Sequence, residues 1–406
     1  MTNIPRVAVV GMGGFAQDHR SWAHELNQKG LIKHVAQVAP TFDHADYATE
    51  IEALKRRDVI VHDTLRDMLA AQREQIDLVT IPTGIHLHRP MTIACLEAGC
   101  HVLVEKPASG SIQDTNAMIE AMEKSDMHVT VGYQHMYRKD VTQLKEWICA
   151  GRFGAIRRLK AFGSWPRTVE YYSRTNWAGK FAINDQWVLD SPHQNAMAHA
   201  INLLCYLSCD RPHESITPKS IQAELYRAND LCTADTVSLR MQSEEGVELF
   251  FAASHCTDEQ LETVFVIEAE KATVLYNYSG GGTIEWHNGG KEAVPVSVSM
   301  ATDVLKEAAA LSVGELHITP APLAIAKAQS LCTCGTFESS RIHELPHNMI
   351  TIDCQNSVVI FGMKEAVLEA FKEAALFSEL SLPWAKPGNE INLQGYDYYP
   401  SYLFPK

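Results

Sequence analysis

The sequence predicts an α/β fold that begins with a doubly wound parallel sheet and continues into a separate β-rich region. Two features lead to this prediction. In the first third of the chain, short apolar runs alternate with segments whose apolar residues have helical spacing. Beyond residue 232, short β-rich segments follow one another with turn residues between them and without long helices. The length of 406 residues suggests two or three domains.

Composition narrows the class of ligand. The chain has 35 Lys and Arg against 49 Asp and Glu, a net charge of −14, which argues against nucleic acid or an anionic membrane as the main partner. Small molecules are therefore the expected ligands. The apolar run before the first glycines, Val7 to Val10, is too short for a signal peptide or a membrane span, so we expect a cytoplasmic protein. Because no Cys/His set has zinc-site spacing, no metal site is expected.

The first apolar run leads directly into a glycine-rich segment of the form G-x-G-x-x-A. Gly11 permits a tight strand-to-helix turn, Gly13 lets backbone approach a pyrophosphate, and Ala16 is small enough for close helix packing. A plain glycine-rich turn is the alternative, but the position at the start of a βαβ pattern favours a dinucleotide. The residues expected to contact the cofactor here are Gly11, Gly13, Gly14, Phe15 and Ala16.

Later apolar runs continue the alternation and predict a Rossmann-type parallel sheet. Helical segments, such as 88–99 and 111–125, follow runs at 32–40, 58–70, 76–84 and 101–109. Ligands of such sheets bind outside the carboxyl ends of the strands. The run "HVLVEKPAS" ends by placing Glu105 and Lys106 side by side before Pro107, so this charged pair is expected at the rim where a cofactor lies.

The β-rich region is expected to form an antiparallel sheet, because its segments are short and divided by turn residues. The predicted strands lie within 233–242, 246–254, 263–270, 272–279 and 282–288.

Three stretches, "GMGGFA", "IDLVTIPTGIHLHRPMTIACLEAGCHVLVEKP" and "NAMAHAINLLCYL", resemble the Gfo/Idh/MocA oxidoreductases. The resemblance implies a Rossmann domain at 1–133 that binds NAD or NADP. It also implies an α+β domain at 134–406, whose large, mostly antiparallel open sheet serves substrate binding and a homodimer or homotetramer. Further cofactor-binding residues implied in this way are Asp43, Thr80, Pro82, His86, Glu105 and Lys106.

The resemblance also implies catalytic residues. The family's lysine near the nicotinamide and the reacting hydroxyl maps onto Lys106. Many members carry a helix of the form D-x-G-x-H-x-x-D, whose histidine is the acid/base and maps onto His199. Here Asn195 and Asn202 replace the two acids, and Met197 replaces the glycine. We expect Asn195, four residues earlier on the same helical face, to orient the imidazole without stabilising an imidazolium as a carboxylate does.

Other groups near this helix remain open as alternatives. Asp190 and His193 are alternative acid/base or substrate-binding residues, although a helix cap or Asx turn before Pro192 is an equally good interpretation of Asp190. Trp177 and Lys180 are expected to line the substrate pocket. The full substrate-binding set is Lys106, Trp177, Lys180, His193, Asn195 and His199.

These residues predict hydride transfer between a nicotinamide and a hydroxyl or keto carbon of a sugar, cyclitol or sugar derivative. An NAD-dependent glycoside hydrolase or lyase and a non-catalytic dinucleotide sensor are the alternatives. NAD is favoured as the cofactor, and NADP remains an alternative. Ala39 and Pro40 occupy the strand end where an acid usually binds the ribose, and no Lys or Arg lies between His34 and Leu54. Asp43 would repel a 2′-phosphate, although a surface acid that caps the next helix is an equally good interpretation of this residue.

Overall fold

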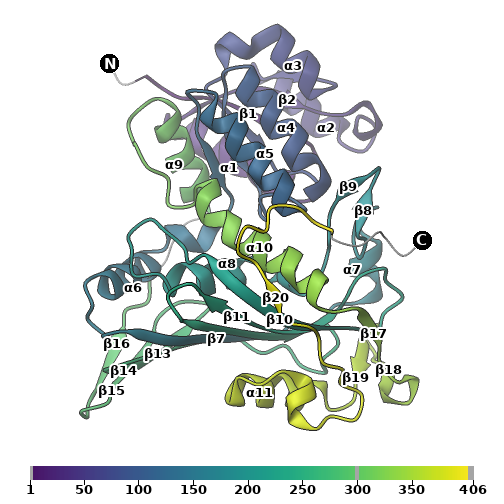
Figure 1. Cartoon of the computed structure of the whole chain (residues 1–406). Coiled ribbons are helices and arrows are strands. Elements are labelled where there is room, and N and C mark those ends of the chain that lie inside the picture. The colour runs from purple at the N-terminus through teal and green to yellow at the C-terminus, as the bar shows by residue number, and fades with distance from the viewer. Residues whose placement is uncertain (1–2, 298–300, 401–406) are drawn as a thin grey trace. The chain divides into compact units, whose positions relative to one another are not determined.

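The computed structural model describes residues 3–297 and 301–400. The chain forms two compact units (Figure 1). The first comprises Met1–Ser109, Asp114–Tyr137 and Ser299–Ala326, so a segment from far along the chain joins the N-terminal region. The second comprises Gly110–Gln113, Arg138–Val298 and Lys327–Lys406.

The first unit contains a six-stranded parallel sheet with strand order β3-β2-β1-β4-β5-β6. This order confirms the predicted Rossmann fold, because the reversal between β1 and β4 creates the crevice where dinucleotides bind. The central strands β1, β4 and β5 are short, largely apolar and mostly buried, as expected for a sheet covered on both faces, whereas the edge strand β3 is partly exposed. The six strands are β1 (Arg6–Val10), β2 (Lys33–Val38), β3 (Ile60–His62), β4 (Leu78–Ile81), β5 (His101–Val104) and β6 (Val129–Val131).

Helices connect and cover these strands. One of them, α9, comes from the distant segment and contacts α1, β4 and β5. That segment is also tied to the sheet where the Val131 amide donates to the Ala321 carbonyl at 2.8 Å. The helices are α1 (Ala16–Gln28), α2 (Ala48–Lys55), α3 (Leu65–Gln72), α4 (Ile85–Glu97), α5 (Ile112–Glu123) and α9 (Asp303–Ser312), with 3₁₀ turns η1 (Thr41–Asp43), η2 (Arg73–Gln75) and η3 (Gln134–Tyr137).

The second unit is built on a large, mostly antiparallel sheet, as predicted. Its order is β16-β15-β14-β13-β7-β12-β11-β10-β17, with β20 also paired to β10. The pairs β7–β12 and β10–β17 are parallel. The strands are β7 (Ile156–Ser164), β10 (Pro218–Arg227), β11 (Thr236–Ser243), β12 (Glu248–Ser254), β13 (Val264–Ala269), β14 (Ala272–Asn277), β15 (Gly282–Trp286), β16 (Lys291–Val294), β17 (Ile342–Glu344) and β20 (Ile391–Asn392).

Smaller elements complete this unit. Two hairpins pair β8 (Ala182–Ile183) with β9 (Gln186–Trp187), and β18 (Ile350–Ile352) with β19 (Val358–Ile360). The helices and helical turns are α6 (Lys139–Cys149), α7 (Val169–Ser173), α8 (Ala198–Leu207), α10 (Leu323–Ser339), α11 (Met363–Glu373), the π-helical turn η4 (Pro192–Ala196), η5 (His347–Met349) and η6 (Phe377–Leu380).

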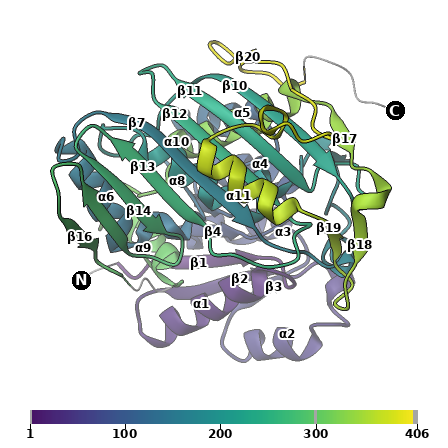
Figure 2. The same cartoon turned by 90° about the horizontal axis from the view of Figure 1, so that it is seen from below.

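Helices pack on both faces of the large sheet. Helix α11 crosses β7 and β12 on the face seen in Figure 2, where Phe162 packs against Phe371 with ring centroids 4.9 Å apart. Helix α8 contacts the same strands from the other face. Gly163 alternates with Phe162 and faces the start of α8, because a Cβ there would lie 2.1 Å from the Met197 sulfur. The glycine therefore permits the close approach of α8.

Every residue of α8 is buried, so its end must be satisfied inside the protein. Lys145 of α6 does this. Its Nζ donates to the carbonyls of Tyr206 at 2.7 Å, Cys209 at 2.7 Å and Glu214 at 2.8 Å, and burial lowers the pKa of the ammonium to about 8. The position of α8 therefore depends on this buried cation.

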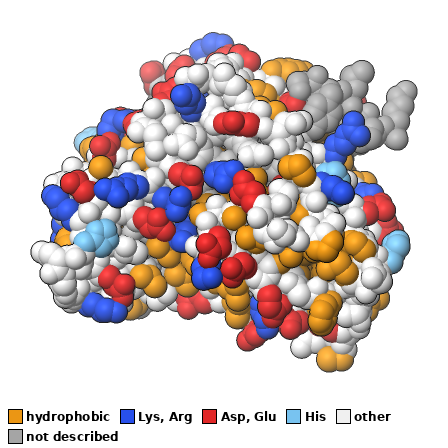
Figure 3. All heavy atoms as spheres, turned by 60° about the horizontal axis from the view of Figure 1, so that its bottom comes forward, with side chains coloured by type: hydrophobic (Ala, Val, Ile, Leu, Met, Phe, Trp, Pro, Cys, Tyr) orange, Lys and Arg blue, Asp and Glu red, His pale blue; other side chains and the backbone are white. Residues whose placement is uncertain are grey.

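One face of the molecule carries intermixed charges rather than charges of one sign. Figure 3 shows acidic and basic side chains next to one another. On the large sheet, Arg158 pairs across strands with Glu248 at 2.6 Å and Glu268 at 3.3 Å. Among the described residues, no helix combines the length and apolar character needed to cross a bilayer.

Candidate active site

The glycine-rich turn of the first unit has the backbone that a dinucleotide site requires. Gly11 and Gly14 have φ angles of +98° and +56°, which L side chains rarely adopt. The Gly11 amide donates to the Val38 carbonyl at 2.9 Å, and a Cβ on Gly11 would lie 3.3 Å from the Ala16 Cβ. Helix α1 begins at Ala16, so its N-terminal amides lie just beyond the turn. This backbone fits an NAD pyrophosphate.

Gly13 lies next to Tyr47 and Arg20, two residues that were not predicted from the sequence to be near the glycine-rich turn. A Cβ on Gly13 would come within 2.8 Å of the Tyr47 hydroxyl. The guanidinium of Arg20 lies 5.7 Å from the Tyr47 ring centroid and donates to the Met12 carbonyl at 2.9 Å. Arg20 follows the glycines on α1, and its sequence context does not distinguish it from an ordinary surface arginine of a helix. It therefore gave no signal.

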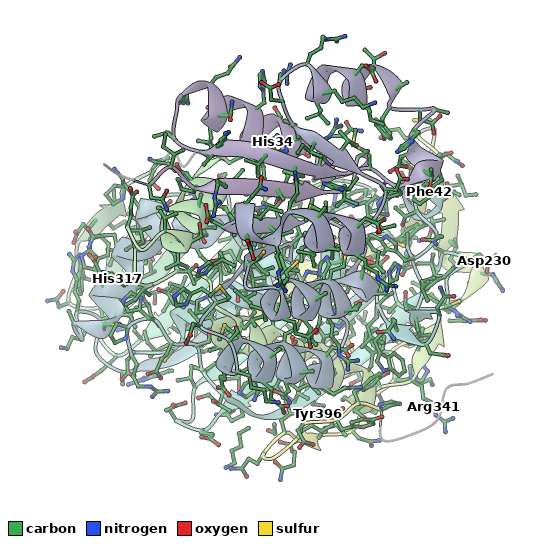
Figure 4. All side chains as sticks on the ribbon, turned by 90° about the horizontal axis from the view of Figure 1, so that it is seen from above. His34, Phe42, Asp230, His317, Arg341 and Tyr396 are labelled. Carbon is green, nitrogen blue, oxygen red and sulfur yellow. The ribbon has the colours of Figure 1, made fainter. Side chains whose placement is uncertain are left out.

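Asp43, the predicted ribose ligand, ends the short helix η1 after β2. Burial and the neighbouring Asp46 raise the pKa of its carboxyl, while His44 and Arg20 act in the opposite direction. Arg20 is thus a basic residue close to Asp43 that comes from α1 rather than from the segment after β2. Phe42, labelled in Figure 4, precedes Asp43 and is 81% exposed.

Three predicted cofactor residues lie around the carboxyl end of β4. Thr80 and Pro82 are buried at the end of this strand, and His86 lies half-buried in the first turn of α4. Burial lowers the pKa of His86. Within the described part of the chain, the Thr80 hydroxyl has no hydrogen-bond partner. These placements bring all three residues to the carboxyl end of β4.

His88 is a buried residue that sequence reasoning passed over. Its Nδ1 lies 2.9 Å from the Pro107 carbonyl oxygen and its Nε2 lies 3.1 Å from that of Thr83. The imidazole therefore joins the loops that follow β4 and β5. Burial lowers the pKa of His88 even though both carbonyls favour the protonated ring. The only hint of His88 in the sequence is its position two residues after His86, and this spacing is too common to indicate a functional residue.

The Glu105 carboxylate is the most constrained polar group at this rim. It is 4% exposed. Oε1 lies 3.1 Å from His19 Nε2 and accepts from Gln134 Nε2 at 3.3 Å, while Oε2 accepts from the Lys106 amide at 3.0 Å. A Cβ on Gly132 would lie 2.3 Å from Oε1, so only glycine leaves room for this arrangement.

His19 holds this carboxylate from α1. Its ring centroid lies 4.7 Å from that of Trp22 and 5.6 Å from that of Phe15, which fixes the imidazole between two aromatic side chains. His19 thereby links the helix after the glycine turn to the end of β5. Lys106 follows Glu105 directly, is partly exposed, and precedes a cis peptide bond to Pro107.

In the second unit, Asp190 and Asn195 lie together. Asp190 is 4% exposed. Its Oδ2 accepts from the Gly179 amide at 2.6 Å, its Oδ1 accepts from Asn195 Nδ2 at 2.9 Å, and its own amide donates to the Lys180 carbonyl at 3.1 Å. The carboxylate is therefore held by the 177–180 loop and by η4.

Asn195 and His199 lie in two different elements, so the prediction that one continuous α-helix carries both residues is wrong. Residues Pro192–Ala196 form a π-helical turn in which the Met197 amide donates to the Pro192 carbonyl at 2.8 Å. Met197 has φ −114° and ψ 23°, and α8 begins after it. His199 lies in the first turn of α8 and is 9% exposed.

The remaining predicted substrate residues differ in exposure. Trp177 is half-buried and Lys180 is exposed; the Lys180 amide donates to the Trp177 carbonyl at 3.2 Å. His193 is fully buried, its ring centroid is 5.6 Å from that of Phe337, and burial lowers its pKa to about 3. A neutral imidazole in this position has the character of a core residue.

Known proteins with similar sequences are dehydrogenases. Residues 5–133 match the model of a family described as an oxidoreductase family with an NAD-binding Rossmann fold, which confirms the predicted NAD-binding Rossmann fold of this region. A 4-carboxy-2-hydroxymuconate-6-semialdehyde dehydrogenase from Sphingobium is 24% identical over 72% of this chain and 84% of its own length. The match to inositol 2-dehydrogenase from Corynebacterium glutamicum is 25% identical and spans 43% of this chain and only 50% of that protein.

Solved structures share the fold across both units. The WlbA dehydrogenase from Chromobacterium violaceum, determined with NADH and UDP-GlcNAcA, has a TM-score of 0.66 and 23% identity over 83% of this chain and 94% of its own. A levoglucosan dehydrogenase determined with NADH and levoglucosan has a TM-score of 0.66 and 17% identity over 83% of this chain and 96% of its own. At these identities, the likeness concerns the fold.

Proposed function

We propose that this chain is an oxidoreductase of the Gfo/Idh/MocA type that transfers a hydride between a nicotinamide and a carbinol or keto carbon of a sugar or cyclitol derivative. The observation that carries the proposal is the anchored Glu105 beside Lys106 at the carboxyl end of β5. In a parallel sheet of this strand order, that position lies at the cofactor crevice. Two of the proteins named above, inositol 2-dehydrogenase and levoglucosan dehydrogenase, are named for a cyclitol and a sugar derivative, and these names support the proposed substrate class.

The first unit binds the cofactor in this proposal. Gly11, Gly14 and the amides that open α1 would hold the pyrophosphate, while Thr80, Pro82 and His86 would line the crevice at the end of β4. Bound NAD would supply the ring that accepts or returns the hydride. Asp43 would accept hydrogen bonds from the adenosine ribose.

Lys106 acts on the reacting oxygen. Its ammonium donates a hydrogen bond to the substrate hydroxyl and stabilises the negative charge that develops as the proton leaves. The Glu105 carboxylate accepts from the Lys106 amide and is itself held by His19, so the backbone of Lys106 has little freedom. We therefore assign Glu105 and His19 as positioning residues for Lys106.

The second unit handles the proton. His199 is the proposed proton acceptor during oxidation and donor during reduction. Asp190 is held by Gly179 and Asn195, so it is fixed well enough to share this role or to hold the substrate hydroxyl. Trp177 and Lys180 are proposed substrate contacts. The proposal leaves His193 out, because its ring is fully buried against Phe337.

A cytoplasmic location and a homodimer or homotetramer remain part of the proposal. Multi-angle light scattering on the purified chain tests the oligomer directly. Two or four copies per particle would agree with the proposal, and a monomer at micromolar concentration would contradict it.

The experiment for the function combines binding and turnover. Fluorescence titration should show NADH binding, and NAD reduction at 340 nm should follow with at least one member of a panel of inositols, aldoses, glycosides and sugar acids. A protein that binds NADH yet leaves NAD unchanged with every compound, and oxidises NADH with none of the matching keto compounds, is not a net dehydrogenase. Product analysis of the glycosides then separates the two alternatives, because a hydrolase or lyase cleaves them and a dinucleotide sensor does not.

A further inference from the structure

We propose that Arg167 and Arg174, stacked on Tyr171, form a subsite for an anionic group of the substrate, a carboxylate or a phosphate. The inference rests on the proposed function, because it assigns the class of sugar that the second unit accepts. The substrate would then be a sugar acid or a sugar phosphate rather than a neutral polyol.

The two arginines converge on one aromatic ring. The Arg174 Cζ lies 3.6 Å from the Tyr171 ring centroid and the Arg167 Cζ lies 4.9 Å from it. Arg167 also approaches Trp165 at 5.7 Å, and Arg174 approaches Trp177 at 5.4 Å. Flat aromatic faces hold guanidinium groups while leaving their N–H edges available for a planar anion.

These charges lack the acidic partners that an arginine pair needs. Within residues 3–297 and 301–400, neither guanidinium forms an ion pair with a carboxylate. Arg167 donates to the carbonyl of its neighbour Pro166 at 3.3 Å, and its Nε is buried without a hydrogen-bond partner among the described residues. Arg174 donates to the Tyr171 carbonyl. A bound anion would relieve the repulsion between the two guanidiniums.

A buried polar group beside the arginines supports the same conclusion. His255 is 3% exposed, its Nδ1 lies 2.9 Å from the Tyr172 hydroxyl, and its Nε2 has no partner among the described residues. Its carbonyl accepts from the Arg167 amide at 3.0 Å. Burial is the main cause that lowers the pKa of His255, and the positive charges of Arg167 and Arg174 lower it further. Both guanidiniums therefore lie near this ring.

The cluster is connected to the proposed acid/base group. Trp177, which contacts Arg174, lies two residues before Gly179, whose amide donates to Asp190. The exposed Lys180 follows Gly179 in the chain. In a protein of net charge −14, the two guanidiniums on the Tyr171 ring attract an anionic substrate group locally, although the overall charge of the protein opposes its approach.

The test compares charged and neutral sugars on the full chain saturated with NADH. Calorimetric titration with glucose, glucuronate and glucose 6-phosphate should give wild-type affinities at least about tenfold higher for one of the charged sugars, since each new hydrogen bond to an ion is strong. A preference for glucuronate would identify a carboxylate site, and a preference for glucose 6-phosphate a phosphate site. Equal affinities for all three, or no binding, would overturn the proposal.

Variants locate the effect. The double variant Arg167→Gln/Arg174→Gln should reduce the affinity advantage of the charged sugar to less than about threefold. Arg174→Gln alone should reduce this advantage by a smaller amount. Because Arg174 is exposed, its substitution is not expected to unfold the core. Arg157→Gln, which removes an exposed charge from β7, is the matched control and should retain the full advantage. If the double variant keeps the wild-type preference, the subsite lies elsewhere. Because binding is measured, the result is independent of whether NAD is ever reduced.

Discussion

Shortening His19 should separate its proposed positioning role from a purely structural one. His19 reaches Glu105 through Nε2, at 3.1 Å, while its Nδ1 has no partner among the described residues. Gln places an amide nitrogen near the position of Nε2, whereas Asn places one near Nδ1. We therefore expect His19→Gln to keep the contact and His19→Asn to lose it.

The magnitude follows from the contacts of the carboxylate. A buried hydrogen bond to a charged group contributes about 1.5–3 kcal/mol, and His19 provides one of the three contacts of Glu105. If this loss were felt entirely in the ordering of Lys106, the catalytic rate of His19→Asn would fall by about 10- to 150-fold. The two remaining donors reduce the effect, so about tenfold is the expected result.

The assay measures kcat, the NADH dissociation constant and the melting temperature for both variants. The account predicts a lower kcat for His19→Asn with NADH affinity within about threefold of wild type, and near-normal kcat for His19→Gln. A fall in melting temperature with unchanged kcat in His19→Asn would make the pair structural. Equal loss of kcat in Gln and Asn would show that the contact through Nε2 is not what matters.

Three further predictions concern other groups. His199→Ala should lower kcat about a hundredfold or more, and a far larger loss in Asp190→Asn would move the acid/base role to Asp190. Asp43→Ala should weaken NADH binding and narrow the preference over NADPH; tighter NADPH than NADH binding by wild type would refute the NAD preference. Because the folded pKa of Lys145 is about 8, the unfolded state holds more protons between pH 8 and 10.5, and stability rises with pH there. Urea unfolding should therefore show wild type gaining about 1–2 kcal/mol relative to Lys145→Met between pH 7.5 and 9.5, and parallel curves would contradict this.

The parallel sheet and the glycine turn were predictable because their causes are local. Buried strands such as Val7–Val10 have continuous apolar runs, and Gly11 has a backbone that other residues avoid. The position of Lys106 at the sheet rim followed from the same rule, since a strand end in sequence is also a strand end in space. The antiparallel sheet followed from short strands and turns.

Contacts between distant segments were not predictable from the sequence. The pair of His19 and Glu105 joins residues 86 positions apart, and nothing around either residue announces the other. Arg20 reaches the neighbourhood of Asp43 from a different element. The interruption at Met197 was missed because a π-helical turn after Pro192 keeps nearly the same apolar pattern as an α-helix.

The central claim is that Lys106 acts in hydride transfer at a bound nicotinamide, and a single-turnover measurement tests it most directly. Wild type, Lys106→Ala and the control Lys33→Ala, which removes an exposed charge from β2 of the same unit, are mixed in excess with NAD and the best substrate of the panel. Absorbance at 340 nm should rise rapidly in wild type and Lys33→Ala. It should stay flat in Lys106→Ala, although that variant binds NADH within about tenfold of wild type. A rise of the same rate in Lys106→Ala would contradict the account.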